Sequence, residues 1–178
     1  MKYSQVILIS ILLIPSLVLA HGPSRQKVTQ EIEVNASAES IWKIVGEFCS
    51  IQDWHPSIKS CTADNGTTVK SIRTIELENG EKINEVLYKH DKDNKRIQYG
   101  MQELEEGRVI DGLPIATHGS TITITESNGI SKVQWKGAFY RSFPGQQPPP
   151  ELTDEACIKA VTNLYKTGLE NIKKIAEK

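Results

Sequence analysis

Residues 153–176, TDEACIKAVTNLYKTGLENIKKIA, predict one long amphipathic helix, against which the other elements can pack. Apolar or small residues recur at spacings of three and four, which is the pattern of a helix with one buried face. Those positions are Cys157, Val161, Leu164, Gly168, Ile172 and Ile175. At 1.5 Å per residue, a helix ending near Ala176 is about 35 Å long, which is enough to cross a whole sheet.

The segment before this helix predicts a β-meander. Residues 144–150 contain four prolines, so they form a stiff connector that cannot enter a sheet. Between residues 58 and 142, short β-rich runs are separated by turn signals with Asn, Asp or Gly. Since short turns join antiparallel neighbours, six antiparallel strands are expected. They are Ile58–Ala63, Thr68–Leu77, Lys82–His90, Arg96–Leu104, Gly119–Glu126 and Ser131–Tyr140.

One strand and one helix precede the meander. Residues 27–34 alternate as a strand does, with Val28, Gln30, Ile32 and Val34 on one face. Apolar residues then follow at helical spacing from Ile41 to Phe48, with Ser37 or Ala38 as the N-cap region. The predicted order is therefore strand, helix, six strands and a long helix.

The N-terminus predicts export. Lys2, the apolar run 6–19 and Val18-Leu19-Ala20 have the layout of a cleavable signal peptide over residues 1–20. We expect a single domain over residues 21–178, with no membrane span after cleavage. Without Lys2, 20 basic residues face 22 acidic ones, so the charge pattern argues against a nucleic-acid partner.

Three cysteines follow the signal peptide. In an oxidising compartment two of them tend to pair, and Cys49 and Cys61 bracket one short loop, whereas Cys157 lies on the predicted helix. We expect a Cys49–Cys61 disulfide. Three reduced, buried thiols are the alternative. A metal site has less support, because no CxxC or HxxxH spacing accompanies the cysteines.

Several segments resemble the START/Bet v 1-like helix-grip (SRPBCC) superfamily, and above all its polyketide-cyclase/dehydrase-type branch. They are ESIWKIVGEF (39–48), WHP (54–56), IRTIEL (72–77), INEVL (83–87), GLP (112–114) and VQWKG (133–137). The resemblance implies an α+β helix-grip fold, in which a seven-stranded curved antiparallel sheet wraps around the long C-terminal helix. Short helices follow strand 1, and a cavity separates the sheet from the long helix. Relatives often carry an aromatic residue soon after the Pro114 turn, where this chain has His118-Gly119.

The leader His21-Gly22-Pro23 and the Trp-His-Pro segment are similar to periplasmic MxaD-type proteins. This narrower resemblance implies a soluble, non-enzymatic accessory factor of methanol oxidation. Its partners would be methanol dehydrogenase and its c-type cytochrome. Two alternatives stay open: a carrier of a lipid or other small hydrophobic ligand, and a polyketide cyclase/dehydrase-like enzyme. The sequence shows no catalytic, metal or cofactor motif, so Glu85 or His55 would act as a general base only if placed against a substrate.

Aromatic and apolar residues of the predicted inner face are candidates to line the cavity. They are Leu87 or Tyr88, Tyr99, Met101, Trp135, Phe139, Val161 and Tyr165, and each has ordinary core packing as its alternative. Arg73 and Glu85 lie on neighbouring strands in phase with apolar residues, so both are expected to point inward as a pair that offers a ligand a polar group. The alternative is a surface ion pair.

Trp54, His55 and Pro56 lie inside the predicted disulfide loop. In one interpretation they anchor the loop: Trp54 closes the end of the cavity and Pro56 stiffens the turn. In the other, the loop presents Trp54 and His55 at the cavity mouth, to a ligand or to a docking protein.

Overall fold

The computed structural model describes residues 22–105 and 108–178. The predicted signal peptide, residues 1–20, lies outside the described residues. The chain forms β1 (Gln26–Val34), α1 (Ala38–Val45), α2 (Ile51–Trp54), β2 (Ile58–Ala63), β3 (Ile72–Leu77), β4 (Lys82–Asp91), β5 (Arg96–Met101), β6 (Ile115–Ser127), β7 (Ile130–Arg141), the 3₁₀ turn η1 (Pro150–Leu152) and α3 (Asp154–Ala176).

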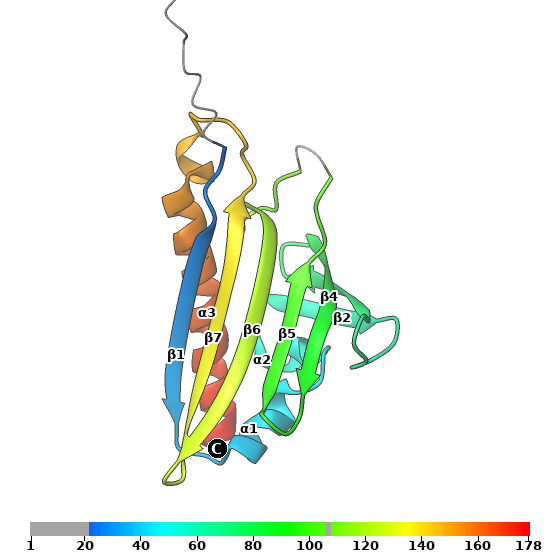
Figure 1. Ribbon diagram of the computed structural model, residues 1–178, viewed down its shortest axis with the longest axis vertical. Coiled ribbons are helices and arrows are strands. Elements are labelled where there is room, and N and C mark those ends of the chain that lie inside the picture. Colours follow the sequence, from blue (N-terminus) through cyan, green and yellow to red (C-terminus); the bar gives the residue numbers. More distant parts are fainter. Residues whose placement is uncertain (1–21, 106–107) are drawn as a thin grey trace, which may run out of the picture.

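The seven strands form one antiparallel sheet in the order β1-β7-β6-β5-β4-β3-β2 (Figure 1). β2 to β7 follow one another as a meander, and β1 joins the sheet beside β7. Turn chemistry fixes two of the hairpins, because Gly80 adopts φ 86° and Asn128-Gly129 adopts φ 54° and 78°. The structure confirms the predicted seven-stranded helix-grip fold, with the short helices after the first strand.

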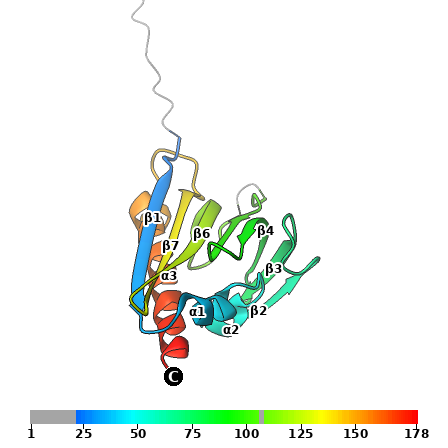
Figure 2. The same cartoon turned by 60° about the horizontal axis from the view of Figure 1, so that its bottom comes forward.

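Helix α3 packs on only part of the sheet. It contacts β1, β7, α1 and α2, while β2 to β5 curve away from it (Figure 2). Its buried residues are Cys157, Val161, Tyr165, Gly168, Leu169 and Ile172. The predicted stripe held Leu164 and Ile175, which are half-buried, in place of Tyr165 and Leu169. The predicted stripe therefore lies on the correct face of the helix, but it includes two half-buried residues and omits two buried ones.

Side-chain caps begin the two longer helices. Ser37 Oγ accepts a hydrogen bond from Ser40 N at 3.2 Å, and Thr153 Oγ1 accepts one from Ala156 N at 3.1 Å. Acidic residues in the first turn of α3 and lysines in its last turn complement the helix dipole. No helix in the described ranges is both long and apolar enough to cross a membrane.

Some predicted strand limits were wrong. β3 begins at Ile72, not Thr68, because Asp64 Oδ1 accepts hydrogen bonds from Ile72 N at 2.9 Å and Ser71 Oγ at 2.8 Å and closes a turn there. Lys70 has a positive φ of 75°, which also interrupts a strand. At the other end of the meander, β5 stops at Met101 and β6 begins at Ile115.

Candidate functional site

A cavity of about 390 Å³ lies between α3 and the half of the sheet that curves away from it. Its walls are mostly apolar, and they include Ile58, Ile75, Ile83, Met101 and Leu113. Exposed polar residues form its rim, so the cavity opens to solvent there. They are Glu78 and Asn79 of the β3–β4 turn, Asp111, and Asn163 and Thr167 of α3.

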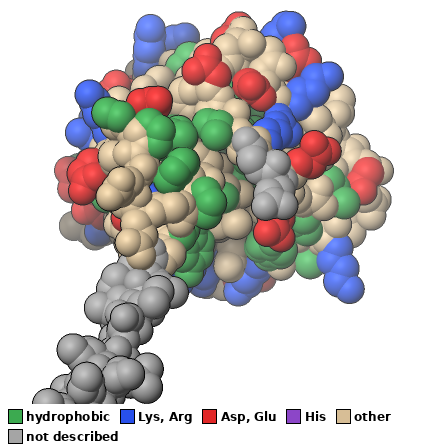
Figure 3. Space-filling view, turned by 90° about the horizontal axis from the view of Figure 1, so that it is seen from above, with side chains coloured by type: hydrophobic (Ala, Val, Ile, Leu, Met, Phe, Trp, Pro, Cys, Tyr) green, Lys and Arg blue, Asp and Glu red, His purple; other side chains and the backbone are tan. Residues whose placement is uncertain are grey.

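Hydrophobic side chains are also exposed at one end of the molecule. Figure 3 looks onto the end that carries the loop from β5 to β6 and the start of α3, and apolar side chains gather there between charged ones. Val109, in that loop, is 39% exposed. Such scattered apolar exposure is normal for a protein surface, so the cavity is the stronger candidate site.

Arg73 and Glu85 form a buried ion pair at the cavity. They are direct partners in the register of β3 and β4, and they are 2% and 5% exposed. Arg73 Nε and Nη2 donate to Glu85 Oε2 at 2.8 and 2.5 Å, and Nη1 donates to the carbonyl of Phe48. The guanidinium also lies over the rings of Phe48 and Tyr99, 4.3 and 4.4 Å from their centres. Both charges point inward as predicted, so the surface ion pair is excluded.

The two members of this pair face the cavity unequally. Glu85 lines it, whereas Arg73 does not, because Phe48 and Tyr99 cover the guanidinium. Both hydrogen bonds from Arg73 reach Oε2 of the carboxylate. Across residues 22–105 and 108–178, no hydrogen bond reaches Oε1. One oxygen of this largely buried carboxylate is therefore available to a ligand.

A chain of hydrogen bonds connects α3 to the sheet beside this pair. Trp135 Nε1 donates to Ser120 Oγ at 2.6 Å, and Ser120 Oγ lies 3.1 Å from the Tyr165 hydroxyl. That hydroxyl lies 2.6 Å from Nε2 of His118, and the rings of Trp135 and Tyr165 stack with their centres 4.3 Å apart. These contacts hold the His118 ring at the cavity wall.

Burial sets the protonation of this chain. It lowers the pKa of His118, an effect that the nearby Glu85 carboxylate only partly offsets, and it raises the pKa of the Tyr165 hydroxyl well above its usual value. Both groups are therefore neutral at pH 7. Because Trp135 N–H can only donate, Ser120 Oγ accepts from it. Ser120 can then donate to the Tyr165 hydroxyl or to the Lys136 carbonyl, which lies 3.5 Å away, so these contacts are compatible with either neutral tautomer of His118.

His118 was not among the predicted site residues. The predicted strand began at Gly119, so His118 fell outside it. In the structure β6 begins at Ile115, and His118 shares the inner face with Ser120 and Ile122, all of which are buried. Alternation extended back from Ile122 would have indicated its inward direction.

Trp54 and His55 lie inside the molecule, 2% and 1% exposed, so their interpretation as an exposed docking surface was wrong. His55 does line the cavity, as the ligand interpretation expected, whereas Trp54 does not. Trp54 meets Trp135 edge to face, with ring centres 5.5 Å apart. His55 Nδ1 accepts a hydrogen bond from Ser57 N at 3.2 Å, so Nε2 carries the proton that it donates to the Leu164 carbonyl at 3.0 Å. Burial lowers the pKa of His55, which keeps the ring neutral. The segment anchors α2 to α3, and only its Pro56 is exposed.

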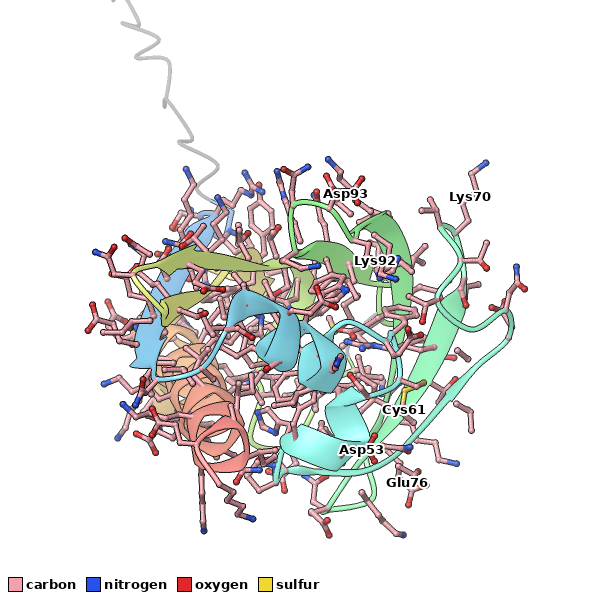
Figure 4. All side chains as sticks on the ribbon, turned by 90° about the horizontal axis from the view of Figure 1, so that it is seen from below. Asp53, Cys61, Lys70, Glu76, Lys92 and Asp93 are labelled. Carbon is pink, nitrogen blue, oxygen red and sulfur yellow. A yellow bond between two sulfur atoms is a disulfide. The ribbon has the colours of Figure 1, made fainter. Side chains whose placement is uncertain are left out.

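Cys49 and Cys61 form the predicted disulfide, with Cα atoms 5.4 Å apart. Figure 4 shows Cys61 at the side of the sheet where α2 meets β2. Cys157 is a buried free thiol whose Sγ donates to the Pro114 carbonyl at 2.9 Å. Within the described residues, no group of His, Cys, Asp or Glu side chains is arranged to hold a metal ion.

The remaining predicted lining residues divide into two groups. Tyr99, Met101 and Trp135 line the cavity. Phe139, Val161 and Tyr165 are buried but belong to the core around α3 and not to the cavity wall. The sequence left open whether Leu87 or Tyr88 of β4 points inward. Leu87 is fully buried and Tyr88 is 54% exposed, so Leu87 points inward, but neither lines the cavity.

Comparisons with known proteins agree with this architecture. The model of a family described as polyketide cyclase/dehydrase and lipid transport matches residues 25–177. No curated protein sequence matches the chain.

Solved structures share the fold at low identity. The protein XoxI from Bacillus cereus is 24% identical, with a TM-score of 0.69 over 84% of this chain and 94% of its own. An uncharacterised protein from Bacillus thuringiensis is 25% identical, with a TM-score of 0.68 over 84% and 98%. Norcoclaurine synthase from Thalictrum flavum, in complex with dopamine and hydroxybenzaldehyde, is 16% identical, with a TM-score of 0.63 over 97% and 96%.

Proposed function

The chain belongs to the polyketide cyclase/dehydrase and lipid transport family, and we propose that it binds a small, largely apolar molecule in the cavity beneath α3. The observation that carries this proposal is the cavity itself, with about 390 Å³ of space, apolar walls and a few convergent polar groups. Cavities of that size and character suit drug-sized ligands. The norcoclaurine synthase structure, which holds small aromatic molecules, supports the same use of the fold.

The polar groups favour binding over general base catalysis. Glu85 is paired with Arg73, and both ring nitrogens of His55 are held in hydrogen bonds. Protonation of Glu85 would leave the buried Arg73 guanidinium without its counter-ion, and protonation of His55 would break the hydrogen bond from Ser57 N. These contacts give the proposed ligand a fixed polar end inside an apolar site.

A cavity-filling variant tests the proposal. Ala160 lines the cavity from α3, whereas its neighbour Lys159 is exposed on the same helix. We expect the protein to enhance the fluorescence of 1-aminoanthracene, a neutral apolar dye, and Ala160→Trp to abolish the enhancement. Lys159→Trp, the matched control, should retain it. No enhancement with the unmodified protein, or equal enhancement by both variants, would contradict binding in this cavity.

We also propose that the protein acts in the periplasm as an accessory factor of methanol oxidation, aiding methanol dehydrogenase and its cytochrome c acceptor. The resemblance to MxaD-type proteins supports this role, and the Cys49–Cys61 disulfide supports an oxidising compartment. Because Trp54 and His55 are buried, any docking surface must use other residues.

Reconstitution tests the accessory role. Purified methanol dehydrogenase and its cytochrome would be assayed for cytochrome reduction with and without the mature protein. We expect faster reduction in its presence, with the Ala160→Trp variant showing whether the effect needs the cavity. An unchanged rate would contradict the accessory role and would leave ligand binding to its own test.

A further inference from the structure

The buried ion pair restricts which chemical groups the cavity can bind. The cation of the pair is covered, since Arg73 lies between the Phe48 and Tyr99 rings and does not line the cavity. The anion is presented, since Glu85 lines the cavity with one carboxylate oxygen free of hydrogen bonds from the described residues. An ionised carboxylate can only accept hydrogen bonds. A ligand group that meets Glu85 must therefore donate one.

The charges around the rest of the cavity have the same sign. Among the described residues that line it there is no lysine or arginine, and the exposed rim carries the carboxylates of Glu78 and Asp111. A ligand carboxylate would enter past two negative groups and meet a third, with no cation in reach. In a low-dielectric cavity such an unpaired anion is costly.

His118 gives the cavity a second polar group. Its ring lines the cavity, and its Nε2 is engaged by the Tyr165 hydroxyl at 2.6 Å, so Nδ1 is the nitrogen left for a ligand. A neutral imidazole nitrogen donates or accepts one hydrogen bond according to its tautomer. A ligand group that can both donate and accept therefore suits either tautomer of His118.

From these contacts we infer that the ligand carries a hydroxyl group, which donates to Glu85 Oε1, and that the cavity discriminates against carboxylates such as fatty acids. A hydroxyl both donates and accepts, whereas an ammonium group only donates. This inference rests on the proposed binding function and names the chemical class of its ligand.

Three probes of similar size and shape test the inference on the unmodified protein: butylbenzene, 4-butylphenol and 4-butylbenzoate. Each would displace 1-aminoanthracene at pH 7.5, where the phenol is neutral and the benzoate is ionised. We expect 4-butylphenol to bind about tenfold more tightly than butylbenzene, because a hydrogen bond to a charged partner contributes on that scale. The benzoate should bind more weakly than either.

The outcomes separate the two proposals. Failure of all three probes to bind would overturn the binding function itself. Binding of butylbenzene as tightly as the phenol, or tighter binding of the benzoate, would leave the binding function in place and overturn the hydroxyl assignment.

A variant locates the preference at the ion pair. Glu85→Gln keeps the shape of the side chain and an oxygen for Arg73, but it removes the negative charge. We expect the phenol to lose most of its advantage and the benzoate to gain affinity, while butylbenzene binds as before. Unchanged ratios among the three probes in a folded Glu85→Gln protein would contradict the role of Glu85. If that variant does not fold, the comparison on the unmodified protein still decides the inference.

Discussion

Removing one member of the Arg73–Glu85 pair should cost far more than removing both. Glu85→Leu would leave the guanidinium, which is 2% exposed, without the acceptor of its Nε and Nη2 hydrogen bonds. An uncompensated buried charge of this kind costs about 3–5 kcal/mol of unfolding free energy. Since whole domains are stable by about 5–15 kcal/mol, this one change removes a large share.

The double variant Arg73→Met/Glu85→Leu should recover most of that loss. Its apolar side chains would pack among Phe48, Tyr99 and the cavity wall, and apolar replacement of a buried pair is often neutral or stabilising. Urea unfolding of the unmodified protein, both single variants and the double variant would give a coupling free energy. We expect a coupling of about 3 kcal/mol or more.

The exposed pair Lys59–Glu76 is the matched control. Its Nζ–Oε1 distance of 2.6 Å resembles that of the buried pair, but the lysine side chain is 58% exposed. Solvent screening should make its coupling a small fraction of the buried one. The reasoning would be refuted if Glu85→Leu cost no more than Glu76→Leu, or if the double variant were as unstable as the two single variants added together.

Three further predictions concern stability. Cys49→Ser/Cys61→Ser should lower the free energy of unfolding by about 3 kcal/mol, because the disulfide closes a loop of 12 positions. A reducing agent should likewise lower the urea midpoint of the unmodified protein, and an unaffected midpoint would contradict the prediction. Gly168→Ala should destabilise the protein by about 1–3 kcal/mol, because the new Cβ would lie 2.7 Å from Cδ2 of His55. This clash should outweigh the better helix propensity of alanine. A raised melting temperature in thermal unfolding would contradict the prediction. Burial lowers the pKa of His55 and His118 below 6.5, so below that pH the unfolded chain binds more protons than the folded protein. The free energy of unfolding should therefore be highest above pH 6.5 and fall at lower pH by up to about 2.7 kcal/mol per pH unit. Equal urea midpoints at pH 7.5 and 5.5 would contradict this prediction.

Periodicity and turn chemistry were sufficient to predict most of the fold. The Gly80 turn marks its hairpin so clearly that the end of β3 at Leu77 and the start of β4 at Lys82 were predicted without error. Both limits of β2 were also predicted correctly. The start of β3 was missed because it depends on hydrogen bonds that Asp64 accepts from Ser71 and Ile72, seven and eight positions later, which leave no alternation in the sequence. Long-range side-chain contacts of this type are invisible to a pattern with period two.

The site was predictable only where local pattern and burial coincide. Arg73 and Glu85 stood in phase with apolar neighbours, so their inward direction followed from alternation. The burial of Trp54 could not be predicted in the same way, because the four-residue helix α2 is too short to show a period, and Trp54 packs against Trp135, far along the chain. Which of the predicted residues face the cavity depends on where α3 leaves the sheet, and no local signal carries that information.

The pairing of β1 with β7 has a consequence for how the protein folds. Gln30 lies opposite Trp135, and Lys173 Nζ donates to the carbonyl of Glu33 at 2.9 Å, so the first strand meets the last strand and the final helix. Contacts between such distant positions slow folding, because a large loop must close before they form. β1 therefore cannot pair in the sheet until β7 has been synthesised. A chain truncated before α3 would leave the part of the core that packs against this helix exposed to proteases. Resistance to degradation therefore requires the strands and the final helix together.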